Sequence, residues 1–416
     1  MTRTLGLTLT LLALAAPSQS QVTSPGAPSQ SDTAWERFAA VAVEARQHAT
    51  VVTLAVRVPT GSADDPAGLE GTAWVLGQSL ARRAGRLLAP LPAEVVVDVG
   101  RRSTTFVVTS EPSSWPDALA TLEGVLFGSD FSVPDAESVR DRLISQLRFV
   151  EGSPVEDFRR RSPEILAEPG AAWSRPTRGY LATVSAVQGA DAERMRIQAY
   201  RAGQATVAVL GAVDPATLAA PEVPSAVDDT PASPRPDFAW SESRDVTEIQ
   251  EVTNSWLSIA APLPAGLGRT VQEFVRATVD ATLTPSVADP YRYSLDVRLV
   301  EAPGGPVLVV DAAVAPEAAT DLEARIRGIF EGSVRVPFDD DFFSWGRRRF
   351  RADALLRDSD PVQAARRITE DLFREGSPRN LRDEIWVLSP QEIDDVLRAF
   401  GPSRVFRLGP DLMGGG

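Results

Sequence analysis

Residues 61–80 decide the fold, and they read GSADDPAGLEGTAWVLGQSL. The first part, GSADDP, is rich in Gly, Asp and Pro, the residues that favour turns. The part that follows is apolar, and Ala73, Trp74, Leu76 and Leu80 recur with the spacing of one helix face. The sequence therefore predicts a turn at 61–66, with Asp64-Asp65-Pro66 as turn residues, and a helix from Thr72 to Leu88 that packs in a core.

Length and charge limit the class of protein. A chain of 416 residues with 43% apolar and 24% charged residues is globular in composition and long enough for two or more domains. Its formal net charge of −14 argues against nucleic acid or an anionic membrane surface as the main partner.

The chain has few residues that could carry metal or nucleophile chemistry. It has no cysteine and one histidine, His48, whereas zinc hydrolase sites depend on two or three His or Cys ligands. His48 stands alone before the first predicted strand, so we expect a surface residue rather than a ligand. Neither a G-x-S-x-G motif nor a glycine-rich phosphate loop is present. We therefore expect no bound cofactor or metal.

The N-terminus predicts export. Residues 1–20 combine a basic residue at Arg3, an apolar run and small residues before Gln21, the pattern of a cleavable secretory signal. Residues 21–34 are rich in Ser, Pro and Gln and predict a flexible mature N-terminus. Later apolar runs are too short to span a bilayer, so we expect a periplasmic or secreted protein without a membrane span.

The remaining chain predicts α+β domains. Trp35 to Arg46 suits a strand or a short helix, and the strands at 94–99 and 104–109 are joined tightly enough to form a hairpin. Further predicted strands lie at 50–59 and 205–210, and predicted helices at 115–127, 134–147, 187–200 and after Pro154. Hairpins grouped with helices favour a largely antiparallel sheet covered by helices on one face.

The order of elements occurs twice. QLRFVEGSPVEDFRRR (146–161) resembles DALLRDSDPVQAARRI (353–368), with Pro154 and Pro361 equivalent. A segment from Asp214 to Pro236 holds six prolines, which no regular element tolerates. The sequence therefore predicts two tandem homologous domains, at 35–213 and 241–416, joined by a Pro-rich linker at 214–240.

These features resemble the pitrilysin or insulinase type (M16) of metallopeptidase, in which a Gly-Leu lead-in precedes an H-x-x-E-H zinc motif on a helix. The resemblance implies two similar domains around a clam-like chamber. In that register the motif positions hold Gly71, Trp74 and Val75, and the position of the family's later glutamate ligand holds Gln146. None of these is a suitable zinc ligand, so the resemblance implies an inactive homologue. We expect the side chain of Trp74 to fill the space of zinc and water and to be buried between the two domains or against the first sheet.

Active members also carry an arginine and a tyrosine in the second domain that grip the substrate backbone. Tyr293 can be placed on the family tyrosine, but residues 286–288 hold no arginine. Arg292 or Arg298 could take its place, although such residues on a strand more often pair across a sheet.

Three functions follow from the resemblance. The first is a non-catalytic subunit that pairs with an active M16 peptidase as a heterodimer and helps form its peptide-binding chamber. The second is a stand-alone peptide-binding or scaffold protein, which could be a homodimer. The third is a weak carboxylate-based hydrolase.

Overall fold

The structure is a computed structural model that describes residues 35, 37–46, 48–129, 131–166, 174–213, 245–284, 292–302, 305–334 and 339–410. The predicted signal at 1–20, the N-terminal stretch at 21–34 and the predicted linker at 214–240 lie outside the described residues. No helix in the described ranges is both long and apolar enough to cross a membrane.

The first half of the chain forms a five-stranded mixed sheet, sheet A, with the order β1-β5-β2-β4-β3. β1 and β5 pair in parallel, and every other neighbouring pair is antiparallel. The hairpin predicted from the strands at 94–99 and 104–109 is β3 with β4. The strands are β1 (Ala40–Ala45), β2 (Val52–Val58), β3 (Ala93–Val99), β4 (Thr104–Ser110) and β5 (Thr206–Gly211).

The second half repeats this topology in sheet B, whose order is β6-β10-β7-β9-β8. The parallel pair is again the first and last strand of the half, β6 with β10. The strands are β6 (Asp245–Ile249), β7 (Ser255–Pro262), β8 (Arg292–Ala302), β9 (Gly305–Val314) and β10 (Arg404–Gly409). The predicted duplication of an α+β unit with a largely antiparallel sheet is confirmed.

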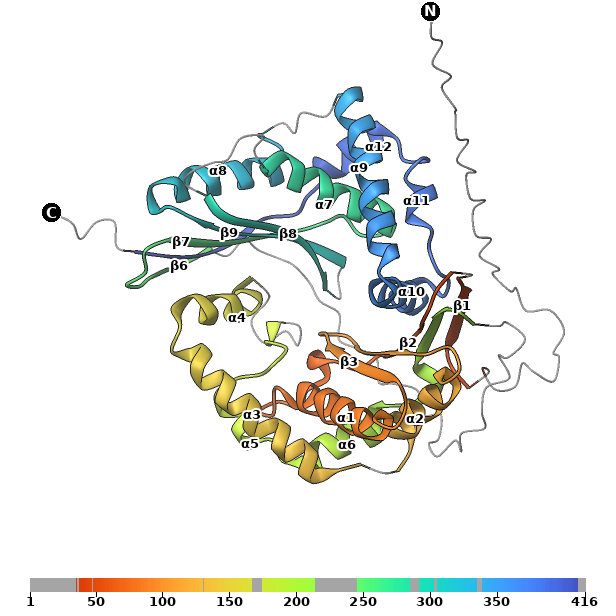
Figure 1. The fold of residues 1–416 in the computed structure, drawn as a ribbon. Coiled ribbons are helices and arrows are strands. Elements are labelled where there is room, and N and C mark those ends of the chain that lie inside the picture. The colour runs from red at the N-terminus through yellow and green to blue at the C-terminus, as the bar shows by residue number, and fades with distance from the viewer. Residues whose placement is uncertain are drawn as a thin grey trace, which may run out of the picture.

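Helices cover one face of each sheet, and the two sheets face each other across the middle of the molecule (Figure 1). The helices of the first half are α1 (Thr72–Leu88), α2 (Trp115–Phe127), α3 (Val133–Glu151), α4 (Pro154–Leu166), α5 (Leu181–Ala186) and α6 (Gly189–Ala199). Those of the second are α7 (Arg269–Leu283), α8 (Ala319–Phe330), α9 (Asp340–Ser359), α10 (Pro361–Glu375), α11 (Leu381–Glu384) and α12 (Pro390–Leu397).

Side chains alternate along β2 between two different environments, as the period of a strand requires. Leu54 and Val56 belong to the core beneath the helices of the first half. Ala55 and Arg57 point to the opposite face, toward the second half of the molecule.

That opposite face of sheet A is covered by α10, a helix from the second half (Figure 1). Ala364, Ala365, Ile368 and Leu372 of α10 pack against small and branched side chains of sheet A, namely Ala55, Val107, Ala208 and Leu210. At the end of the contact, the hydroxyl of Thr206 donates to the carbonyl oxygen of Thr369 at 3.2 Å, and Arg57 forms an ion pair with Glu370.

The reciprocal contact is made by α4 of the first half on sheet B. Phe158 of α4 stacks on Phe406 of β10 with ring centroids 4.4 Å apart. Arg161 of α4 forms an ion pair of 2.8 Å with Glu248 of β6. The two halves therefore exchange one helix each, and the equivalent prolines Pro154 and Pro361 begin the two exchanged helices.

Candidate functional site

The helix α1 is held at its N-terminus by a buried carboxylate. The two carboxylate oxygens of Asp65 accept hydrogen bonds from the backbone N–H groups of Gly71 and Ala73, each at 2.7 Å. These are N–H groups that the first turn of a helix leaves without intrahelical partners. Asp65 is 4% exposed, and burial raises its pKa to about 7, although the two backbone hydrogen bonds act to lower it.

Gly71 immediately precedes α1, and its position leaves no room for a side chain. Its φ is +104°, in the left-handed region that glycine adopts without strain. A Cβ added here would lie 2.7 Å from Cγ2 of Val184 and 2.9 Å from the carbonyl oxygen of Arg178. The backbone at Gly179 packs equally closely against this turn, because a Cβ added at Gly179 would lie 2.0 Å from the carbonyl oxygen of Glu70. The close approach of segment 178–184 therefore requires glycine at position 71.

The other three positions named by the sequence differ in their exposure to solvent. Val75 is fully buried in the core of the first half. Trp74 is half-buried against the edge of that core, and the guanidinium of Arg178 lies 5.9 Å from its ring centroid. Gln146 is exposed on α3. Trp74 thus packs against the core of the first half, with a cation over its ring.

His48 is exposed in the turn between β1 and β2, apart from the α1 region. Over the described residues, no group of three or more His, Asp or Glu side chains is arranged to hold a metal ion.

The candidate peptide-binding residues lie along β8 with different surroundings. Tyr293 is 59% exposed at an irregularity in the β8–β9 register. Arg292 donates to the carbonyl oxygen of Leu283 at the end of α7. Arg298 forms a two-atom ion pair with Asp311 of β9, each nitrogen 2.8 Å from the same carboxylate oxygen.

Of these three, Arg298 lines a cavity between the two halves. The cavity has two adjoining parts of about 220 and about 310 Å³, and both parts are lined by Arg57, Asp98, Thr105 and Glu370. The larger part reaches from the β3–β4 turn of sheet A to residues 298–300 of β8. This part is lined by residues of β2, β3 and β4 of sheet A and of β8 of sheet B, and β3 and β8 are the edge strands of their sheets.

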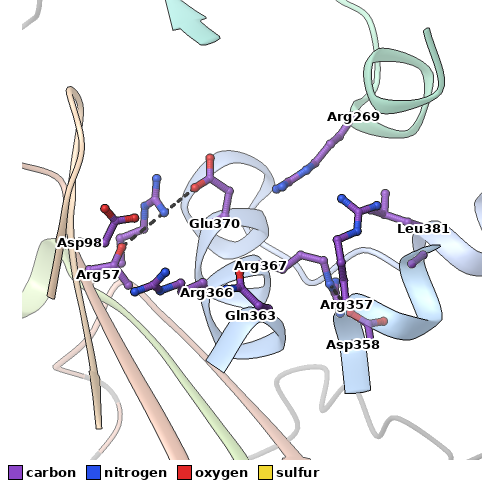
Figure 2. A pocket seen from close by; sticks show the side chains of 12 residues that line it. Arg57, Asp98, Arg269, Arg357, Asp358, Gln363, Arg366, Arg367, Glu370 and Leu381 are labelled. Carbon is purple, nitrogen blue, oxygen red and sulfur yellow. Dashed lines mark hydrogen bonds and ion pairs between the residues drawn. The ribbon is translucent and has the colours of Figure 1, made fainter. Parts of the chain in front are cut away.

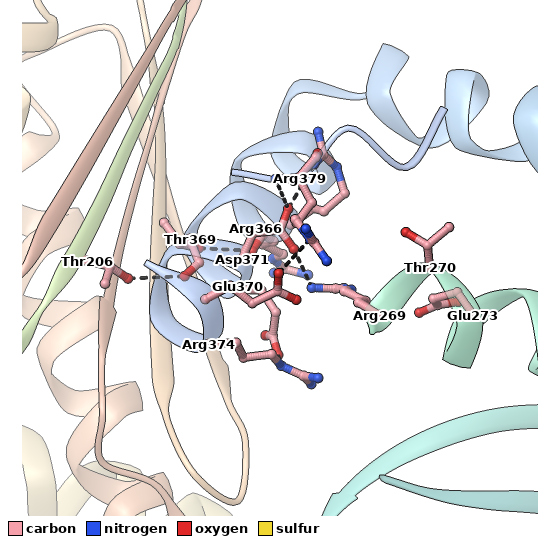
Figure 3. A network of polar contacts seen from close by, with 12 residues as sticks. Thr206, Arg269, Thr270, Glu273, Arg366, Thr369, Glu370, Asp371, Arg374 and Arg379 are labelled. Atoms are coloured by element: carbon pink, nitrogen blue, oxygen red, sulfur yellow. Dashed lines mark hydrogen bonds and ion pairs between the residues drawn. The ribbon is translucent and has the colours of Figure 1, made fainter. Parts of the chain in front are cut away.

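A buried network fixes the wall of this cavity (Figure 3). Asp371 of α10 has no exposed surface, and its oxygens accept from Arg269 at 2.7 Å, Arg367 at 3.0 Å and the backbone N–H of Arg379 at 3.2 Å. Burial raises the pKa of Asp371, while the two guanidinium charges lower it. The network joins α10 to the start of α7, so the exchanged helix is anchored to its own half as well as to sheet A.

Comparison with known proteins gives matches in structure alone. No family model matches the sequence, and no curated protein matches it. The chain superposes on a structure from Alicyclobacillus acidocaldarius described as an M16-like peptidase, with TM-score 0.74 at 12% identity over 89% of this chain and 96% of that chain. The fold is that of the M16 peptidases.

Two further M16-fold structures extend the comparison. One is described as an inactive M16 peptidase domain from Pseudomonas fluorescens, with TM-score 0.73 at 10% identity over 89% of this chain and 96% of that one. The other is a periplasmic protease from Escherichia coli, with TM-score 0.70 at 12% identity over 89% of this chain and 44% of that one. The M16 fold thus occurs both in proteases and in a domain described as inactive.

Apart from Arg298, the sequence did not indicate the cavity residues. Arg101 and Arg102 were visible as a turn, and Arg366 and Arg367 as part of the internal repeat. Only the exchange of α10 onto sheet A brings these arginine pairs to one cavity. For Arg366 and Arg367, the equivalent R-R pair at 159–160 of the repeat is a signal that could have drawn attention to them.

Proposed function

We propose that this chain is a non-catalytic M16-type subunit that binds peptide in the cavity between its halves and pairs with an active zinc M16 peptidase. The observation that carries the proposal is the packing of α1. At the first motif position a side chain would overlap segment 178–184, and at the third Val75 is fully buried in the core. Zinc ligands at these positions would need a different arrangement of the neighbouring segment.

A peptide site in this chain is supported by the edge strands. β3 and β8 each have one side that no other strand of their sheet occupies, and both border the cavity. An extended peptide can add to such an edge through backbone hydrogen bonds. We take the two repeats, at 35–213 and 241–416, as the two domains of the proposed subunit, exported by the signal at 1–20 to the periplasm or the medium.

The test is co-expression with a protein that carries H-x-x-E-H and is encoded beside this chain. We expect the two to co-purify as a heterodimer and the pair to cleave peptides faster than the zinc protein alone. If the two purified proteins neither associate nor change peptide cleavage, the pairing is refuted.

A second function, a stand-alone peptide-binding protein, is favoured by the cavity itself. Both of its walls come from one chain, with Arg57 and Asp98 on sheet A and Arg298 on sheet B. Peptide binding by the purified chain with no effect on any M16 peptidase would favour this function, and light scattering would show whether it acts as a homodimer.

A further inference from the structure

The cavity between the halves is lined mainly by arginine, in a protein whose formal net charge is −14. Eight arginines and three carboxylates line its two parts. The arginines come from β2, the β3–β4 turn, α7, β8, α9 and α10, and they are Arg57, Arg101, Arg102, Arg269, Arg298, Arg357, Arg366 and Arg367. The carboxylates are Asp98, Asp358 and Glu370.

Two of the three carboxylates are already engaged by arginine. Glu370 is paired with Arg57 and also accepts from Arg374 at 2.6 Å. Asp358 is paired with Arg367 at 2.9 Å (Figure 2). Carboxylates behind the lining engage further arginines, since Asp371 pairs with Arg269 and Arg367, and Asp311 pairs with Arg298. The side chains that line the cavity itself are eight arginines against three carboxylates.

Arginines from the two halves also act on one another across the cavity. Burial and, as a second cause, the charge of Arg298 on sheet B lower the pKa of Arg101 to about 10. Burial lowers the pKa of Arg57 as well. The negative charge of Glu370 raises this pKa, and the positive charge of Arg269 from the second half lowers it. Like charges held this close are stabilised by an anion placed between them.

One guanidinium in the cavity has no partner in the described structure. The Nε of Arg366 is buried and forms no hydrogen bond, and the rest of its guanidinium makes no ion pair with a described residue. Figure 2 shows its side chain extending from α10 toward β2, where Arg57 lies. A buried donor without an acceptor is costly, and a carboxylate in the cavity would satisfy it.

We propose that the cavity selects acidic peptides, with Asp or Glu side chains of an extended peptide bound by the arginine cluster. Guanidinium groups bind carboxylates through two parallel hydrogen bonds, which suits a cavity lined by many of them. The occupant is a peptide rather than a small anion because residues of the edge strands β3 and β8 line the larger part of the cavity, and an extended peptide can add to a strand edge. This inference rests on the proposed function, to which it adds the class of peptide.

The test compares two short fluorescein-labelled peptides that differ only in Glu against Gln, by fluorescence anisotropy on the full chain. We expect the Glu peptide to bind at least about tenfold more tightly, as expected when charged hydrogen bonds replace neutral ones. The difference should shrink as salt concentration rises.

Variants then locate the effect. Arg366→Gln should weaken the Glu peptide several-fold and leave the Gln peptide unchanged, and Arg366→Lys should weaken it less. Arg142→Gln, on the exposed face of α3 outside the cavity, is the matched control and should change neither peptide. Thermal melts confirm that the variants fold.

Different failures have different meanings. If both peptides bind equally and Arg366→Gln has no effect, the selection for acidic peptides is wrong while peptide binding stands. If neither peptide binds, the proposed peptide site fails as well. If inorganic phosphate displaces the Glu peptide at a concentration similar to the peptide's own dissociation constant, the cavity is a small-anion site and the inference is wrong.

Discussion

Replacing Ile368 by alanine should destabilise the half of the molecule to which Ile368 does not belong. Ile368 lies on α10 in the second half, is 3% exposed, and packs on the inner face of sheet A. Two of its neighbours there, Ala55 and Ala208, are too small to fill the space that three lost carbons would leave. We expect a loss of about 3 kcal/mol in the free energy of unfolding, from the lost burial and the remaining cavity.

The assay is hydrogen exchange with mass spectrometry, together with urea unfolding. In Ile368→Ala, protection should fall in strands β2 and β5 of sheet A, which are far from residue 368 in sequence. The matched control is Ile329→Ala on α8, where a residue 1% exposed packs within the second half. That variant should cost a similar free energy but lower protection in β7 more than in β2. Protection losses in Ile368→Ala that stay within 245–409 would refute the helix exchange.

Three further changes test other parts of the structure. Phe158→Ala removes the stack on Phe406 and should lower the free energy of unfolding by about 3–5 kcal/mol. Protection from hydrogen exchange should fall in β10 of the other half, and unchanged exchange at 404–409 would contradict this. Burial raises the pKa of Asp65 above its value in the unfolded chain, so protonation of Asp65 favours the folded state. The wild-type protein should therefore lose stability relative to Asp65→Asn as the pH rises from about 4 through about 7. A relative stability that instead grows with pH would show that the two helix N–H bonds outweigh burial. Gly71→Ala should lower the melting temperature more than Gly68→Ala, since both residues have positive φ but only position 71 is crowded. Equal decreases in melting temperature would mean that Val184 moves aside at no cost in stability.

Much of the fold could be predicted because each element has a local signal. Helix 72–88 was predicted with the bounds that α1 has, since its apolar spacing has one clear period and Asp65-Pro66 ends the turn before it. Aspartates such as those at 339–341 are typical of a helix start, and the side chain of Asp339 accepts from the N–H of Phe342 at 2.7 Å at the start of α9. The repeat was visible because equivalent prolines begin equivalent helices.

What could not be predicted depends on contacts between distant residues. The sequence pattern around Pro361 predicts a helix but not that it crosses to sheet A, because its apolar face would fit either sheet. Likewise Arg57 was one residue of a predicted strand, and only the pairing with Glu370 of α10 places it in a cavity. The Asp65 cap was missed since its carboxylate accepts from N–H groups six and eight residues later, outside the usual capping spacing.

The most direct test of a non-catalytic partner subunit is a titration of this chain into a fixed amount of an active M16 peptidase, chosen from those encoded beside it, with the cleavage rate of an acidic fluorogenic peptide as the readout. Without the peptidase, this chain should give no cleavage even with added zinc. The rate should rise with added chain and level off at equimolar amounts, and Arg366→Gln should reduce the rise for the acidic peptide. Cleavage by this chain alone in the presence of zinc, or a rate that stays unchanged at every ratio, would contradict the proposal.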